Sequence, residues 1–225
     1  MKRLKIGIVL LTFLLAGMVL VPGASAYRAD NWGPNYGLFE DFSNAAYNAA
    51  VKQSSMGYAA YYDSDNSAST AWDNLPSDQV FSFNGHGNNG GIIFSDDTWI
   101  YANNPGSSQS ISSLTGGQLN DLALAVFVNC NSGYGTSNLL TSTVGHGGDA
   151  AIGFTGEITK AQSDYWTGRL WYYLDQSYSI QNAANMAQSD TLSSYWYAFG
   201  GIDTMTYQQS GSGYSRVLDP AVAGV

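Results

Sequence analysis

Two apolar runs that each end in polar, glycine-containing sequence decide the expected fold: VFSFNGHG at residues 80–87 and LALAVFVNCNSG at residues 122–133. Both runs are short, rich in β-branched and aromatic residues, and bounded by Asn, Gly and Ser. This pattern is typical of parallel strands that are covered on both faces. The first strand ends next to His86 and the second next to Cys130, the only cysteine of the chain.

Other predicted elements alternate along the chain around these two strands. Helices are predicted at residues 39–56, 68–75, 136–144, 163–176 and 180–188. Strands are predicted near the start of 27–37, at 58–62 and 150–154, and as a hairpin of 90–94 with 98–101. Strands that alternate with helices predict an α/β fold with an open, mostly parallel sheet, as a single domain over residues 27–225.

Two segments carry little pattern. Residues 103–117 are rich in Ser, Asn and Gly and are expected to form a surface loop, which could be a lid or a mere connector. The tail at residues 204–225 is expected to be irregular.

The first 26 residues have the composition of a secretory signal peptide. Residues 1–5 carry three positive charges. They precede an apolar run at 6–21 and an Ala-Ser-Ala cleavage site at 24–26. A retained membrane anchor is the alternative, but this site and the Pro22-Gly23 break favour cleavage after Ala26. The chain has no other long apolar run, so we expect a secreted or extracytoplasmic protein without membrane association after cleavage.

The charge balance excludes one class of partner. The predicted signal peptide carries three basic and no acidic residues, so its removal takes the net charge from −9 to −12. Such an acidic surface repels nucleic acid.

Asp63-x-Asp65-x-Ser67 is similar to part of a calcium-binding loop, but it lacks the glycine and the terminal Glu of that motif. We therefore expect no cofactor, and calcium has only this weak support.

The strand ends point to thiol chemistry. In open α/β sheets the functional crevice lies outside the carboxyl ends of the strands, where both His86 and Cys130 are expected. A cysteine nucleophile needs a base, and histidine titrates near neutral pH. His146 lies between a helix and the next strand, and therefore at the opposite rim. Gly87 allows a sharp turn and close approach to a substrate, and its N–H with that of Cys130 could bind an oxyanion.

The order of these motifs resembles the caspase-like cysteine peptidases of clan CD. A strand ends in His-Gly, the next ends in Cys, and a helix followed by GGDAAIGF at 147–154 comes after them. Caspases, metacaspases, legumain, gingipain, clostripain and CHAT domains belong to this group. The resemblance covers about residues 38–160 and implies a three-layer α/β/α fold with Cys130 as nucleophile, His86 as base and Gly87 N–H in the oxyanion hole. Asn129 stands where the family usually has Ala or Ser.

The resulting hypothesis is a secreted cysteine endopeptidase that acts on a peptide or protein substrate through a thioester. Two alternatives stay open: a thioester-forming transpeptidase or acyltransferase, and a non-catalytic secreted binding module in which Cys130 is a small buried hydrophobic residue. Acidic residues expected on the same rim could form a pocket for Arg or Lys at the cleavage position. These candidate substrate-binding residues are Asp63, Asp96 and Glu157, with Asp65 and Asp97 beside them.

Overall fold

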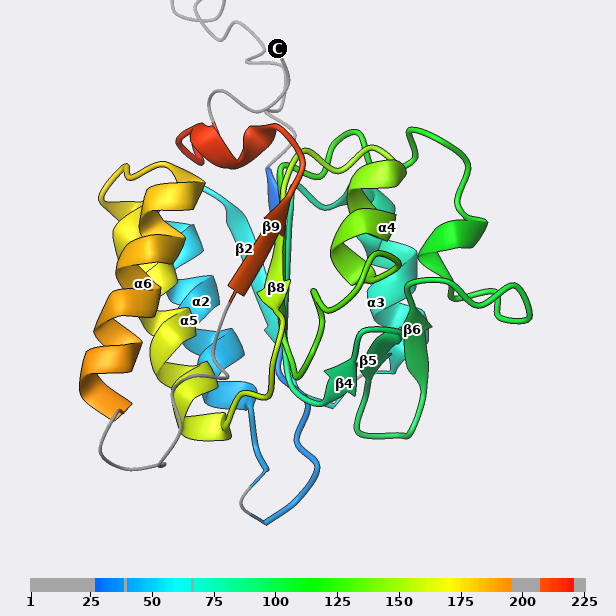
Figure 1. Ribbon diagram of the computed structural model, residues 1–225, viewed down its shortest axis with the longest axis horizontal. Coiled ribbons are helices and arrows are strands. Elements are labelled where there is room, and N and C mark those ends of the chain that lie inside the picture. The colour runs from blue at the N-terminus through cyan, green and yellow to red at the C-terminus, as the bar shows by residue number, and fades with distance from the viewer. Residues whose placement is uncertain (1–26, 39, 66, 196–206, 221–225) are drawn as a thin grey trace, which may run out of the picture.

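A six-stranded sheet forms the centre of the protein, with the strand order β2-β1-β3-β7-β8-β9 (Figure 1). The computed structural model describes residues 27–38, 40–65, 67–195 and 207–220, so the predicted signal peptide lies outside the described residues. Five strands are parallel, and β9 pairs with β8 in the antiparallel sense. The strands are β1 (Arg28–Trp32), β2 (Ala59–Asp63), β3 (Val80–Asn84), β7 (Leu124–Val128), β8 (Ala151–Phe154) and β9 (Tyr207–Ser210).

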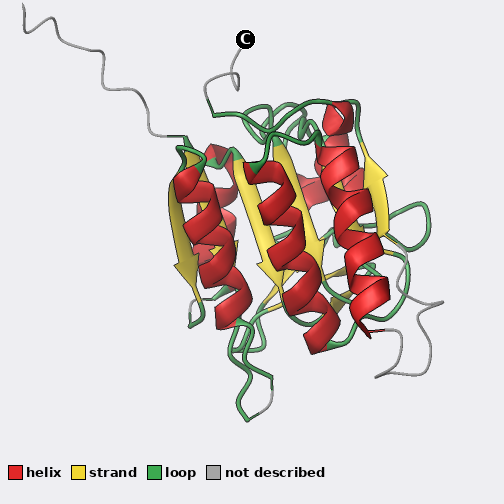
Figure 2. Cartoon of the chain, turned by 90° about the vertical axis from the view of Figure 1, so that its left-hand side faces the viewer, coloured by secondary structure: helices red, strands yellow, loops and turns green. Residues whose placement is uncertain are grey.

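Helices cover both faces of this sheet. On one face, α2 (Ser43–Ser55), α5 (Lys160–Asp175) and α6 (Ile180–Tyr195) lie side by side (Figure 2). On the other face lie α3 (Ala68–Asn74) and α4 (Leu139–Gly145), together with a small antiparallel sheet (Figure 1). That sheet consists of β4 (Gly87–Asn88), β5 (Gly91–Ile93) and β6 (Trp99–Tyr101). Short 3-10 turns are found at η1 (Leu75–Ser77), η2 (Ile111–Ser113) and η4 (Gly213–Ser215). The predicted three-layer α/β/α architecture is confirmed.

The apolar core is split by the sheet into two clusters. Alternate residues of β7 serve the two sides: Val126 and Val128 pack on the side of α5, and Phe127 packs on the side of α3 and α4. Trp166 and Trp171 of α5 are fully buried in the first cluster. Burial of a large apolar side chain contributes about 1.5–3 kcal/mol. Because both faces are covered, β3 and β7 read as nearly continuous apolar runs, which is why the sequence identifies them.

The structure differs from the sequence-based expectation in the tail, and it bears on the two alternatives for residues 103–117. The tail, predicted to be irregular, contains the regular strand β9 at residues 207–210; residues 204–206 and 221–225 of that tail lie outside the described residues. Residues 103–117 were open to interpretation as a lid or a connector. Ile111 is 1% exposed and packs in the core, which favours the connector.

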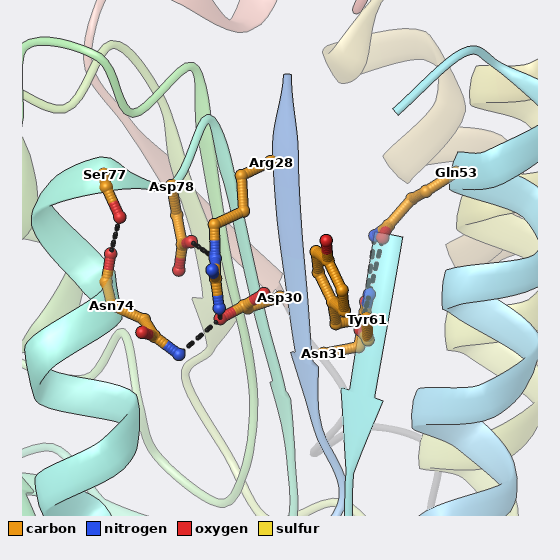
Figure 3. A network of polar contacts seen from close by, with 8 residues as sticks. All are labelled: Arg28, Asp30, Asn31, Gln53, Tyr61, Asn74, Ser77 and Asp78. Carbon is orange, nitrogen blue, oxygen red and sulfur yellow. Dashed lines mark hydrogen bonds and ion pairs between the residues drawn. The ribbon is translucent and has the colours of Figure 1, made fainter. Parts of the chain in front are cut away.

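Strand β1, an interior strand of the sheet, lacks an apolar pattern because its buried polar side chains are paired. Asn31 donates from Nδ2 to the Tyr61 carbonyl at 3.0 Å, and Gln53 donates to Asn31 Oδ1 at 2.9 Å (Figure 3). Both amides are buried. A buried polar group is tolerated when it is hydrogen-bonded, so a strand with Asp and Asn at its centre can still lie inside the sheet, between β2 and β3.

The Arg28 guanidinium contacts two buried acidic side chains on the opposite side of β1. Arg28 contacts Asp30 at 2.7 Å and Asp78 at 3.0 Å, and Asn74 donates to Asp30 at 2.9 Å (Figure 3). Asp78 is 0% exposed. Burial, together with the charge of Asp30, raises the pKa of Asp78 to about 9, although Arg28 opposes the shift. Asp78 is therefore a neutral acid at neutral pH.

This network makes the stability of the protein depend on pH. The pKa of Asp78 is about 9 in the folded protein and about 3.9 in an unfolded chain. Between these values the folded state binds more protons, so the free energy of unfolding falls as pH rises, by at most about 1.4 kcal/mol per pH unit from this group. We expect Asp78→Asn, which keeps the shape of a neutral Asp78, to lose at least half of the decline seen between pH 6 and 8.5.

Urea unfolding at pH 5, 6, 7 and 8.5 measures this decline. Asp73→Asn, which removes an exposed carboxylate from α3, serves as the matched control and should keep the wild-type slope. Equal slopes for Asp78→Asn and wild type would contradict the assignment of Asp78 as a buried neutral acid.

Candidate active site

The carboxyl ends of β3 and β7 lie side by side and bring His86 and Cys130 to one cavity. The two strands are parallel and pair in register, with Asn84 opposite Val128. His86 and Cys130 follow these ends by two residues each and line a cavity of about 310 Å³. The cavity is also lined by Glu40, Phe42, Gly85, Val128, Ile158, Thr159, Lys160 and Ser163.

The turn that carries Cys130 is fixed by hydrogen bonds to its neighbours. Ser132 donates from Oγ to the Phe127 carbonyl at 2.8 Å and accepts from the Phe154 N–H at 2.8 Å. Asn131 adopts a left-handed backbone conformation with φ of 58°. These contacts turn the chain sharply after β7 and leave the Cys130 side chain half-buried, with Sγ 3.7 Å from the Ile158 carbonyl oxygen.

Aromatic rings and a carboxylate hold His86. The imidazole packs against Tyr36 and Phe42, with ring centres 4.7 and 5.6 Å apart, respectively. The backbone N–H of His86 donates to the Tyr36 hydroxyl at 3.2 Å, and that hydroxyl donates to the Ile93 carbonyl. Burial raises the pKa of Tyr36, so its hydroxyl stays neutral. Glu40 Oε2 lies 3.3 Å from His86 Nε2, and both side chains are about half exposed.

Glu40 was not identified from the sequence, although a signal for it exists. It lies in the loop that follows β1, and β1 is the neighbour of β3 in the sheet. The rule that directs attention to the carboxyl ends of parallel strands applies to this loop as well. It could not be used there because the end of β1 was not defined by an apolar pattern.

Gly87 is required by space rather than by its backbone conformation. A Cβ at this position would lie 2.5 Å from the Gly91 carbonyl oxygen and 2.7 Å from Asn129 Nδ2. No residue other than glycine fits here without a shift of the backbone. The sequence suggested a glycine at position 87 for a sharp turn and for close approach to a substrate. The structure adds a second reason, because Gly91 and Asn129 leave no room for a side chain there.

The start of α5 forms one wall of the cavity. Thr159 caps this 16-residue helix by accepting from the Gln162 N–H, and Thr159, Lys160 and Ser163 line the cavity. Lys160 forms an ion pair with Asp164 and lies 5.4 Å from the centre of the Phe42 ring. The N-terminal end of a helix favours negative charge, so this wall suits a thiolate or an oxyanion.

Comparison with known proteins gives a result for the structure only. No family model and no curated protein matches the sequence. Among solved structures, the Arg-specific cysteine proteinase gingipain R is similar with a TM-score of 0.61 at 14% identity, over 84% of this chain and 46% of that chain. The complex of Porphyromonas gingivalis RgpB pro- and mature domains gives 0.62 at 15% identity, over 86% of this chain and 49% of that one. Separase from the Saccharomyces cerevisiae separase–securin complex gives 0.53 at 12% identity, over 84% and 12%.

The fold is caspase-like. The chain spans about half the length of the gingipain structures and about an eighth of the separase chain. The architecture implied by the motif order is therefore confirmed. At these identities, the roles of the residues in this caspase-like fold have to be argued from their own geometry.

Three predicted substrate-binding acids are not among the residues that line the cavity of His86 and Cys130. Asp63, at the end of β2, lines a different cavity of about 220 Å³. Asp96 accepts from the N–H and the hydroxyl of Thr98 in the turn between β5 and β6. Glu157 is exposed and directly precedes Ile158, a lining residue. Their role in binding stays a prediction.

The second histidine, His146, lies near the amino end of β8, at the end of the caspase-like sheet opposite the His86–Cys130 cavity, as expected. His146 ends α4, and its Nδ1 is 2.7 Å from the Ser142 carbonyl oxygen. The chain then enters β8 at its amino end.

Among the described residues, no group of three or more His, Cys, Asp or Glu side chains could hold a metal ion. Within the same part of the chain, no helix has the length and apolarity to cross a membrane.

Proposed function

We propose that the protein is a secreted cysteine endopeptidase that hydrolyses peptide bonds through a thioester. One observation carries the proposal: the only cysteine and the histidine beside Glu40 line one cavity at the carboxyl edge of a caspase-like sheet. Export depends on residues 1–26, and the partner is a peptide or protein substrate without a cofactor. A thiol and an imidazole at one crevice are the parts that acyl transfer requires.

Each residue then has a defined step. His86 takes the proton of Cys130 Sγ, and the sulfur attacks the carbonyl carbon of the scissile bond. The N–H groups of Gly87 and Cys130 donate to the oxyanion of the tetrahedral intermediate. Its collapse breaks the C–N bond, and His86 gives the proton to the leaving amine. A water molecule then loses a proton to His86 and attacks the thioester, which releases the carboxylic acid and restores the Cys130 thiol.

The residues around His86 support this role for it. Glu40 contacts Nε2 and thereby orients the ring, which leaves Nδ1 as the nitrogen for the thiol proton. Tyr36 and Phe42 restrict the ring between them. The helix end at Thr159 provides a wall that favours the thiolate.

A preference for Arg or Lys at the cleavage position is part of the proposal. Glu40 lines the cavity and Glu157 adjoins it, so a basic side chain would meet opposite charge. The gingipain with the same fold is described as Arg-specific. Lys160, which also lines the cavity, is occupied by Asp164.

A peptide library with Arg, Lys, Asp and Asn at the cleavage position tests the function. We expect turnover of the Arg and Lys peptides, with products identified by mass spectrometry. The matched control is wild-type protein alkylated with iodoacetamide, which modifies its single cysteine and should remove all turnover. Turnover that survives alkylation, or a Cys130 that reacts only after denaturation, would overturn the proposal. Preference for Asp would overturn the specificity alone.

A further inference from the structure

Asn129, the residue before Cys130, links the two catalytic segments. Its side chain is 0% exposed. From one Nδ2 it donates to the Asn88 carbonyl at 3.4 Å and to the Cys130 carbonyl at 3.2 Å. The first acceptor belongs to the segment that follows His86, and the second belongs to the nucleophile itself. A single amide group therefore connects the His86–Asn88 segment to the Cys130 turn.

Gly87 rests directly on this amide. A Cβ at Gly87 would lie 2.7 Å from Asn129 Nδ2 and 3.1 Å from Asn129 Cγ. The Asn129 amide therefore fills the space that a side chain at position 87 would need. A side chain without an amide at position 129 would leave this part of the Gly87 backbone without its support.

The hydrogen bonds of the Asn129 side chain leave its oxygen unsatisfied within the described part of the chain. Its Oδ1 is buried and has no hydrogen-bond partner among the described residues. A buried acceptor left unpaired is unfavourable, and an apolar side chain at the same place would avoid that loss.

We propose that Asn129 is a positioning residue that holds the Gly87 N–H in register with Cys130 for stabilisation of the oxyanion. The inference rests on the proposed peptidase function and gives Asn129 a role within it. The two hydrogens of Nδ2 fix both carbonyls and thereby the spacing between donor and nucleophile. A displacement of about 1 Å in such a donor costs on the order of 100-fold in rate.

Asn129→Ala is the decisive variant. We expect kcat to fall by about 30- to 100-fold while KM stays within about twofold, because the contact acts on the intermediate rather than on substrate binding. Alkylation of Cys130 by iodoacetamide should stay within about twofold of wild type, because displacement at carbon forms no oxyanion. Asn129→Ser, which can keep one donor, should recover part of the loss and replaces the alanine variant if that variant fails to fold.

Asn31→Ala is the matched control. Asn31 is also a buried asparagine that donates to a backbone carbonyl, but it lies on β1, and its hydrogen-bond partners Gln53 and Tyr61 belong to neither the His86–Asn88 segment nor the Cys130 turn. Its replacement should reduce stability and leave kcat within about twofold. A wild-type kcat in Asn129→Ala, or equal kcat losses in both variants, would overturn the positioning role.

Hydrogen exchange provides a readout that does not depend on turnover. The peptide covering residues 85–92 should exchange faster in Asn129→Ala than in Asn31→Ala, because the link to Asn88 is lost. If wild type hydrolyses no peptide, the proposed function fails, and the exchange rate still decides the link. Unchanged exchange in residues 85–92 would overturn the inference whatever the activity.

Discussion

Cys130→Ala is expected to abolish peptide turnover, and His86→Ala to lower kcat by about 10²- to 10⁴-fold. The alanine at position 130 leaves no nucleophile in a chain with one cysteine. The alanine at position 86 leaves the thiol without an imidazole base on the cavity wall, since the lining residues include no other histidine. Initial rates on the best library peptide measure both losses. Alkylation of Cys130 at about pH 7 should slow in His86→Ala, because the thiolate is the reactive form.

His146→Ala is the matched control for His86→Ala. It makes the same chemical change at the other edge of the sheet and should leave kcat within about twofold. Glu40→Gln should have an intermediate effect of about two- to fivefold, because a polar contact between half-exposed side chains contributes little. Loss of activity in His146→Ala equal to that in His86→Ala would contradict the assignment of the base.

Gly87→Ala is expected to reduce kcat by about 100-fold and the free energy of unfolding by about 1–3 kcal/mol. The added methyl group would lie 2.5 Å from the Gly91 carbonyl oxygen, so the backbone has to move. That movement displaces the N–H proposed to bind the oxyanion. Steady-state kinetics and urea unfolding of the same preparations measure the two effects.

Gly116→Ala is the control for this substitution. A Cβ at Gly116 meets nothing within 4 Å, so stability should change by less than about 0.5 kcal/mol and kcat should not change. The alkylation rate of Cys130 should be preserved in both glycine variants. If Gly87→Ala kept wild-type kcat, its N–H would not be the oxyanion donor.

The sequence was most informative where burial dictates composition. β3 and β7 are covered on both faces, and their apolar runs gave their positions and hence the places of His86 and Cys130. β1 was only weakly predicted because Asp30 and Asn31 are paired inside the protein, a compensation that depends on residues distant in sequence. Glu40 was missed for the same reason.

The last strand could not be predicted for a different reason. β9 has the sequence YQQS, and no apolar alternation marks it as a strand. It becomes a strand because β8 offers an unpaired edge, with pairs from Ala151 to Phe154. An edge partner of this kind is chosen by tertiary structure rather than by local propensity. The space requirement of Gly87 is equally tertiary, since its neighbours are Gly91 and Asn129.

The five-residue register between β3 and β7 has a consequence for divergence. Backbone hydrogen bonds, which any side chain except proline permits, set the relative position of the two strand ends. Strand side chains can therefore be exchanged over long times while the spacing of the loops above them persists. This explains how a chain with only 12–15% identity to gingipain and separase superimposes on them while family models fail to match it. The backbone hydrogen bonds of the sheet can therefore keep a fold the same where little of the sequence is shared.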